Sequence, residues 1–161
     1  MAGVVETIAF GQHNVRASQI FFRSSLSYGL VNLMPLVPGH VLVISQRRVA
    51  RFRDLTPPEV SDLWTSAQRI GEVVERHYKG DALTMAIQDG AAAGQTVSHV
   101  HIHVIPRRRG DFARNDEVYE RLDMDKDRTK RTEEEMAEEA ALLARYFDDG
   151  NTNSTDGATS P

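Results

Sequence analysis

The feature that most constrains this chain is the segment His-Val-His-Ile-His-Val-Ile at residues 99–105, where three histidines alternate with β-branched residues. Such alternation predicts a half-buried β-strand, because side chains on a strand point to opposite faces with a period of two. Val100, Ile102 and Val104 should therefore pack into a core, while the three histidines line the opposite, exposed face. We expect Pro106 to end the strand, since proline removes a donor from the ladder.

Three imidazoles on one strand face leave two chemical interpretations. One is a metal site, since histidine is a common zinc ligand. The other is nucleophilic and acid–base chemistry, since imidazole titrates near neutral pH. On extended backbone the outer two Cα atoms lie ~13 Å apart, so one ion would not easily reach His99, His101 and His103. The spacing favours the nucleophile and leaves a structural metal site as the alternative.

Composition narrows the class of protein. A chain of 161 residues, 40% hydrophobic and 26% charged, suits one domain with a single core. The absence of cysteine excludes a disulfide framework, a thiol nucleophile and cysteine-ligated zinc. The net charge of −4 argues against nucleic-acid and anionic-membrane partners. There is no secretory signal and no apolar run of the ~18 residues that span a bilayer, so we expect a cytoplasmic protein, with the nucleus as a second location.

Periodicity and helix caps predict an α+β fold. Two capping boxes, at residues 56–59 and 132–135, open helices that should run to about Lys79 and Phe147. Short connections favour one antiparallel sheet of about five main strands with the two helices on one side. The predicted strands cover residues 8–12, 19–23, 25–34, 40–45, 83–88 and 99–105.

We expect one domain over residues 1–148. Within it, residues 111–131 are dense in charge and predict a mobile loop. The polar tail at 149–161 should be disordered.

A small-residue loop runs directly into the histidine strand. Gly94, Gln95 and Thr96 offer backbone N–H groups, an amide and a hydroxyl just before the triad. Small residues let a phosphate approach the backbone closely. Because the loop adjoins three histidines, it favours phosphate chemistry.

Together these residues resemble the histidine triad family, whose pattern is His-x-His-x-His-x-x with x apolar. Further segments are similar to its fragile histidine triad branch, the dinucleoside triphosphate hydrolases. They are Phe-Gly-Gln-His at 10–13, Val-Pro-Gly-His-Val-Leu-Val at 37–43, Gln-Asp-Gly at 88–90, Ala-Gly-Gln-Thr-Val at 93–97 and Gly-Asp-Phe at 110–112. The similarity covers roughly residues 8–147.

The resemblance implies cleavage of diadenosine triphosphate to AMP and ADP through a covalent AMP adduct on His101. It implies that His103 acts on the leaving-group side and that His99 and His40 support the nucleophile. The substrate-binding residues that it implies are His13, Asn32, Gln88, Gly94, Gln95, Thr96, Val97 and His103. Tyr119 matches a tyrosine in the mobile loop of relatives, which the resemblance implies as a candidate phosphorylation site with a regulatory role.

The resemblance also implies a homodimer whose two sheets join. It implies no cofactor or metal bound by the protein, with Mg²⁺ or Mn²⁺ carried by the substrate phosphates. Three alternatives remain open: a nucleoside phosphoramidate hydrolase, a dinucleoside polyphosphate phosphorylase or adenylyltransferase, and a signalling module whose active form is the nucleotide-loaded dimer.

The residues themselves explain why a histidine suits this chemistry. An attacking imidazole at pH 7 must be neutral, and its other nitrogen must hold the proton. A backbone carbonyl near the start of the strand would fix that tautomer.

Overall fold

The computed structural model describes residues 3–123 and 128–148. The strands are β1 (Thr7–Phe10), β2 (His13–Arg16), β3 (Ile20–Arg23), β4 (Ser27–Val31), β5 (Val41–Ser45), β6 (Ala82–Ala86) and β7 (His101–Arg107). The helices are α1 (Pro57–His77), α2 (Glu117–Asp123) and α3 (Glu133–Asp148), with short 3-10 turns η1 (Ala17–Gln19), η2 (Phe52–Asp54) and η3 (Ala91–Ala93). The predicted α+β class is confirmed.

The histidine strand lies inside a five-stranded antiparallel sheet of order β3-β4-β5-β7-β6. β5 pairs with β7 so that Leu42 faces His103 and Ile44 faces His101. β1 and β2 form a separate hairpin, and β2 was not predicted. The expected five-stranded sheet is therefore present, and it holds His103 between β5 and β6 and His101 against β5.

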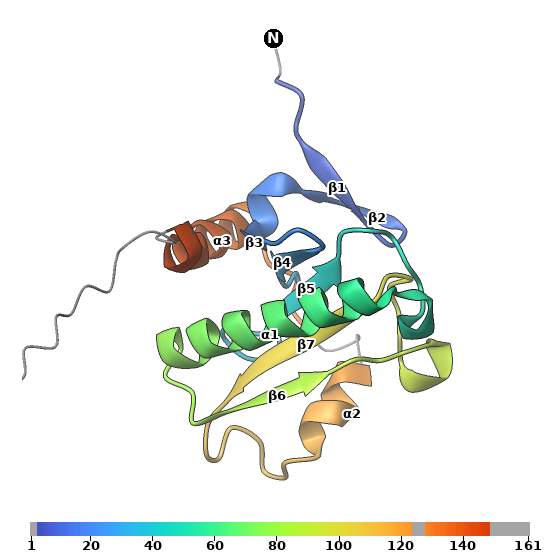
Figure 1. Ribbon diagram of the computed structural model, residues 1–161. Coiled ribbons are helices and arrows are strands. Elements are labelled where there is room, and N and C mark those ends of the chain that lie inside the picture. Colours follow the sequence, from blue (N-terminus) through green and yellow to red (C-terminus); the bar gives the residue numbers. More distant parts are fainter. Residues whose placement is uncertain (1–2, 124–127, 149–161) are drawn as a thin grey trace, which may run out of the picture.

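Two helices cover one face of this sheet. Figure 1 shows α1 lying across β6 and β7. Leu63 and Ile70 on α1 and Leu143 on α3 are buried in one cluster with Val43 and Ile102 of the central strands. The apolar alternation of the triad segment therefore faces the main core, as predicted.

α1 begins and ends close to the predicted residues. The Thr56 hydroxyl accepts from the Glu59 N–H at 3.3 Å, and the Thr56 N–H donates to the Glu59 carboxylate at 2.9 Å, so the capping box is confirmed. The helix ends at His77, and the Gly80 N–H bonds back to its last turn at 2.8 Å. Trp64 on this helix is 38% exposed.

The opposite face of the sheet carries a second layer, and the prediction of an exposed histidine face is wrong. The β1–β2 hairpin packs Phe10 against Leu42 and Ile44 at one end of that face. The side chains of His99, His101 and His103 are only 0%, 6% and 7% exposed. The alternation therefore marks two buried faces, one apolar and one polar.

α2 is the other part of this second layer, and it replaces part of the loop predicted for residues 111–131. Val118 and Leu122 lie one helical turn apart and are buried against Ile105 of β7. Pro106 does not end β7 either, because it pairs with Leu83 of β6 beyond the point where the β5 pairing stops. Proline is tolerated where one side of a strand lacks a partner.

α3 begins at the second predicted capping box. The Thr132 N–H donates to the Glu135 carboxylate at 2.8 Å, and the Glu135 N–H donates to the Thr132 hydroxyl at 3.1 Å. The predicted tail at 149–161 and residues 124–127 of the predicted loop lie outside the described residues. Among the helices that the structure describes, none is long and apolar enough to cross a membrane.

Candidate active site

His99 lies just before β7, and two backbone groups fix its ring. Its Nε2 lies 2.7 Å from the Ser45 carbonyl oxygen. A carbonyl only accepts, so Nε2 carries the proton and Nδ1 accepts from the Gly11 N–H at 3.1 Å. Gly11 has a φ of +56°, and a Cβ there would clash with Val97, so this contact needs glycine.

His101 presents an unprotonated nitrogen. Its Nδ1 lies 2.7 Å from the His99 carbonyl oxygen, so Nδ1 carries the proton and Nε2 keeps its lone pair. The predicted backbone carbonyl at the start of the strand is confirmed as the group that sets this tautomer. The Phe10 ring packs edge-on against the imidazole, with centroids 5.3 Å apart, and limits how the ring can turn.

His40 and His103 form a relay that starts at the backbone. The Leu36 N–H donates to His40 Nδ1 at 3.0 Å, which leaves the proton of His40 on Nε2. His40 Nε2 then donates to His103 Nδ1 at 3.0 Å, so His103 carries its own proton on Nε2. That Nε2 is buried and has no hydrogen-bond partner among the described residues. A buried donor of this kind is costly unless a ligand pairs with it.

Asn32 lies beside this relay. Its Oδ1 accepts from the Met34 N–H at 3.0 Å. Its Nδ2 lies 3.3 Å from His40 Nε2, but once His40 holds its proton there, both groups are donors. The Asn32 amide can therefore donate to a ligand without disturbing the relay.

The four imidazoles are neutral at pH 7. Burial lowers the pKa of His99 and of His101 below the ordinary value of 6.5. Burial, helped by nearby Arg128, lowers the pKa of His40 to about 3. Burial, helped by the neighbouring rings of His101 and His40, lowers the pKa of His103 well below 6.5. His101 can therefore act as a nucleophile without first losing a proton.

The predicted phosphate loop is braced by Gln95. Its Oε1 accepts from the Gly90 N–H at 2.7 Å, and its Nε2 donates to the carbonyls of Ala50 and Val97 at 2.9 Å each. These bonds use both amide protons of Gln95, so its side chain shapes the loop in this structure. The exposed Thr96 keeps its side chain at the loop surface.

The hairpin and α2 bring in the remaining predicted residues. Gln12 clamps the hairpin to the loop, donating to the Thr96 carbonyl at 3.0 Å and accepting from the Ser98 N–H at 3.2 Å. His13 pairs with Phe10 across the hairpin and is exposed, which puts it at the rim of the site rather than among the buried histidines. Tyr119 lies on α2 and is 48% exposed.

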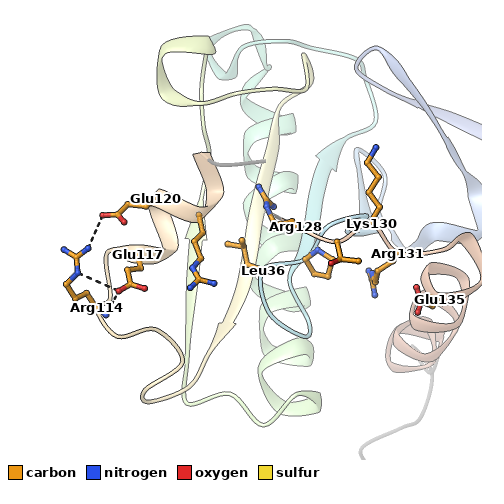
Figure 2. A pocket seen from close by; sticks show the side chains of 11 residues that line it. Leu36, Arg114, Glu117, Glu120, Arg128, Lys130, Arg131 and Glu135 are labelled. Atoms are coloured by element: carbon orange, nitrogen blue, oxygen red, sulfur yellow. Dashed lines mark hydrogen bonds and ion pairs between the residues drawn. The ribbon is translucent and has the colours of Figure 1, made fainter. Parts of the chain in front are cut away.

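A groove of about 870 Å³ lies between α2 and the start of α3, and none of the four histidines lines it. Figure 2 shows Leu36 near the middle of its lining, with Arg128, Lys130 and Arg131 on one side and Glu117 and Glu120 on the other. Leu36 thus belongs to both the groove and the histidine site, since its side chain lines the groove and its backbone orients His40.

In the described part of the chain, no group of three histidine or acidic side chains is placed to hold a metal ion.

Several groups that build the site could not be read from the sequence. The Leu36 N–H, the Ser45 carbonyl and the His99 carbonyl act through the backbone, which every residue has. Gly11 belongs to a segment that the sequence does single out, although its contact with His99 was not predicted. Asp123 of α2, which hydrogen-bonds Gln88 at 2.6 Å, lies in the segment that was predicted to be a loop.

Comparison with known proteins agrees with this geometry. The family model of the HIT domain matches residues 13–110. The chain belongs to the histidine triad (HIT) family. The matched region holds β5, β7 and the four histidines of the site, and it leaves out β1, α2 and α3.

Relatives match over most of their length. The bis(5'-adenosyl)-triphosphatase of Dictyostelium discoideum is 52% identical, with 92% of this chain and 98% of the relative covered. The bifunctional bis(5'-adenosyl)-triphosphatase/adenylylsulfatase FHIT of Arabidopsis thaliana is 46% identical, with 92% and 88% covered. The solved structure of Plasmodium falciparum diadenosine triphosphate hydrolase in complex with cyclomarin A aligns with a TM-score of 0.76 at 31% identity, covering 92% of this chain and 89% of that one.

Proposed function

We propose that this HIT protein is a hydrolase that cleaves diadenosine 5',5'''-P1,P3-triphosphate to AMP and ADP. The observation that carries the proposal is the pair of ring nitrogens that the backbone contacts set. His101 Nε2 keeps a lone pair and His103 Nε2 holds a buried, unpartnered proton, on rings whose centroids are 5.0 Å apart. A nucleophile and a donor therefore stand side by side on one strand face. The names of the relatives support the same substrate.

In the first chemical step, His101 Nε2 attacks the phosphorus of one AMP unit. A nitrogen–phosphorus bond forms while the bond from phosphorus to the bridging oxygen breaks, and ADP leaves. His103 Nε2–H donates to that bridging oxygen as its negative charge grows. The ring of His101 becomes cationic, and its Nδ1–H bond to the His99 carbonyl stabilises the new charge. Water then attacks the phosphorus, the nitrogen–phosphorus bond breaks and AMP is released.

The other predicted residues bind the substrate around this step. Asn32 donates to a ribose hydroxyl, and the backbone of the loop held by Gln95 faces the phosphates. A divalent cation, Mg²⁺ or Mn²⁺, enters with the substrate phosphates. The resemblance to the family assigns eight residues to substrate binding: His13, Asn32, Gln88, Gly94, Gln95, Thr96, Val97 and His103.

The test is the His101→Ala variant assayed beside the wild-type protein. We expect hydrolysis to be abolished while ADP still binds, because the variant removes the attacking nitrogen and leaves the phosphate loop intact. Radiolabelled AMP trapped on the wild type and absent from the variant would support the adduct. An AMP adduct on the His101→Ala protein would contradict it.

Product analysis separates hydrolysis from phosphorolysis. In ¹⁸O-labelled water a hydrolase puts the label into AMP, and added inorganic phosphate does not change the products. A phosphorylase would transfer the AMP unit to inorganic phosphate, so ADP would form in place of AMP. Diadenosine triphosphate and tetraphosphate assayed side by side would give the preferred chain length.

A second substrate is suggested by the Arabidopsis relative, whose name includes adenylylsulfatase. Adenylyl sulfate presents the same AMP phosphorus with sulfate as the leaving group. The first step would therefore be the same, with sulfate in place of ADP beside His103. We expect AMP and sulfate from adenylyl sulfate in the wild type and neither from His101→Ala. Cleavage by the variant would assign that activity to another site.

We also propose that the protein is a homodimer joined along β6. β6 is an edge strand, and edge strands tend to pair or to be covered. Beside it, Trp64, Leu83 and Met85 line a groove of about 520 Å³.

Trp64→Arg should reduce the mass in solution to that of a monomer. Leu142→Arg on α3 is the matched control, because Leu142 is exposed to the same extent, 37% against 38%. A monomeric wild type would contradict the proposal.

A further inference from the structure

The last residue of α2 lies against the phosphate loop. Asp123 Oδ1 accepts a hydrogen bond from Gln88 Nε2 at 2.6 Å. Gly94 has a φ of +91°, and a Cβ added there would clash with both Asp123 and Gln88. The carboxylate therefore lies directly over the glycine that lets an anion approach this backbone.

This is the place that the proposed function gives to a substrate phosphate. The resemblance assigns Gln88 and Gly94 to substrate binding, and in the structure a carboxylate already contacts them. A phosphate oxygen and the Asp123 oxygen cannot occupy the same position over Gly94. Binding of substrate there must be an exchange of one anion for another.

The body of α2 is held independently of this contact. Val118 and Leu122 are buried against Ile105. Arg128 also donates to the Leu122 carbonyl at 3.1 Å and to the Met34 carbonyl at 3.0 Å. The Asp123–Gln88 bond, in contrast, is exposed to solvent. The Asp123 side chain can therefore leave Gln88 while the helix stays in place.

We infer that Asp123 is a competing anion, built into the protein, that occupies Gln88 in the substrate-free enzyme and must be displaced by the substrate phosphates. This inference rests on the proposed function. Its consequence is a weaker apparent affinity, because only the fraction of molecules with Gln88 released can bind. The same competition favours release of the nucleotide products.

The test compares Asp123→Asn with Glu120→Gln in hydrolysis of diadenosine triphosphate. Both variants remove one negative charge from α2, but in the structure only Asp123 contacts Gln88. We expect Asp123→Asn to lower KM about threefold to tenfold with kcat within about twofold, because asparagine keeps the acceptor oxygen but removes the charge, which weakens a solvent-exposed hydrogen bond. Glu120→Gln should leave both constants unchanged, and Asp123→Glu, which keeps the charge, should stay close to the wild type.

A double-mutant cycle with Gln88→Ala locates the effect. If Asp123 acts through Gln88, then adding Asp123→Asn to the Gln88→Ala protein should not lower KM further. The inference is overturned if Asp123→Asn leaves KM unchanged or raises it, if Glu120→Gln lowers KM equally, or if the decrease persists without Gln88.

A failure of the proposed function would look different. If the wild type does not turn over diadenosine triphosphate, the function fails while the inference about Asp123 can still be tested. Calorimetric titration with ADP then decides it: tighter binding by Asp123→Asn than by the wild type supports the competing anion, and equal binding overturns it.

Discussion

Acid should destabilise this protein through its buried histidine relay, and His40 is the residue on which to test this. His40 is held neutral with a pKa of about 3, whereas an unfolded histidine titrates at 6.5. Below pH 6.5 the unfolded chain therefore binds the proton that the native state refuses. The contribution of His40 to stability is fully present above pH 6.5 and is lost progressively as the pH falls toward 3.

The size of the effect follows from the two pKa values. A pH of about 5 lies roughly 1.5 units below the pKa of the unfolded histidine, and each unit is worth about 1.4 kcal/mol. Protonation of the unfolded chain at His40 alone therefore lowers the free energy of unfolding by about 2 kcal/mol. His103, whose pKa is also well lowered, acts in the same direction. Glu59, with a pKa lowered to about 2 by Arg47, loses its contribution only below its unfolded value of 4.5. The interval between about pH 7.5 and about pH 5 therefore isolates the histidines.

Urea denaturation of the wild type and of His40→Asn at these two pH values is the assay. Whatever the substitution costs at the higher pH, the loss of stability on acidification should shrink by about 2 kcal/mol. Val43→Ala, which removes buried apolar contacts from the adjacent strand and no proton site, should lower stability equally at both pH values. If His40→Asn loses as much as the wild type between the two pH values, His40 is not the group that the fold keeps neutral.

Three further predictions concern the frame of the site. Gly94→Ala and Gly110→Ala should each destabilise the fold by about 1–3 kcal/mol through backbone strain, because both glycines have a positive φ and the side-chain ends of Asp123 and Gln88 can move away from a Cβ at 94; only Gly94→Ala should also weaken ADP binding, and equal ADP affinity of the two variants in calorimetric titration would refute a phosphate site at Gly94. Thr56→Ala should cost about 1 kcal/mol through the lost helix cap and leave kcat unchanged; a thermal melt and one rate suffice. Ile102→Ala should cost about 2–5 kcal/mol and lower kcat by loosening the histidine strand from behind; an unchanged kcat would show that the strand is held by its neighbours alone.

The fold was predictable where a local signal existed. The capping boxes at Thr56 and Thr132 fixed two helix starts, and the alternation at 99–105 identified the central strand. The second layer over the histidines was not predictable by the same means. α2 hides two buried residues, Val118 and Leu122, among charges, and a single turn of spacing is too short to stand out as a helix.

The candidate site, like the fold, was predictable only where the sequence carries a local signal. The three histidines and the neutral form of His101 were predicted from pattern and chemistry, as was the kind of group that sets its tautomer, a backbone carbonyl, but not that this carbonyl belongs to His99. The role of Gln95 in substrate binding stays a prediction; what the sequence did not show is that its amide is bonded to the loop. An amide in a sequence shows what it can donate but not which backbone group lies beside it.

The main chain sets the proton positions in this site. The amides of Leu36 and Gly11 and the carbonyls of Ser45 and His99 orient three rings, and His40 orients the fourth, His103. A substitution of Leu36 or Ser45 keeps its amide or carbonyl unless proline enters at 36. Mutational drift at those two positions can therefore change volume and polarity around the reaction centre without scrambling which nitrogen attacks and which one donates. The surroundings of such a site can therefore change, by natural or designed substitution, while the attacking and the donating nitrogen stay the same.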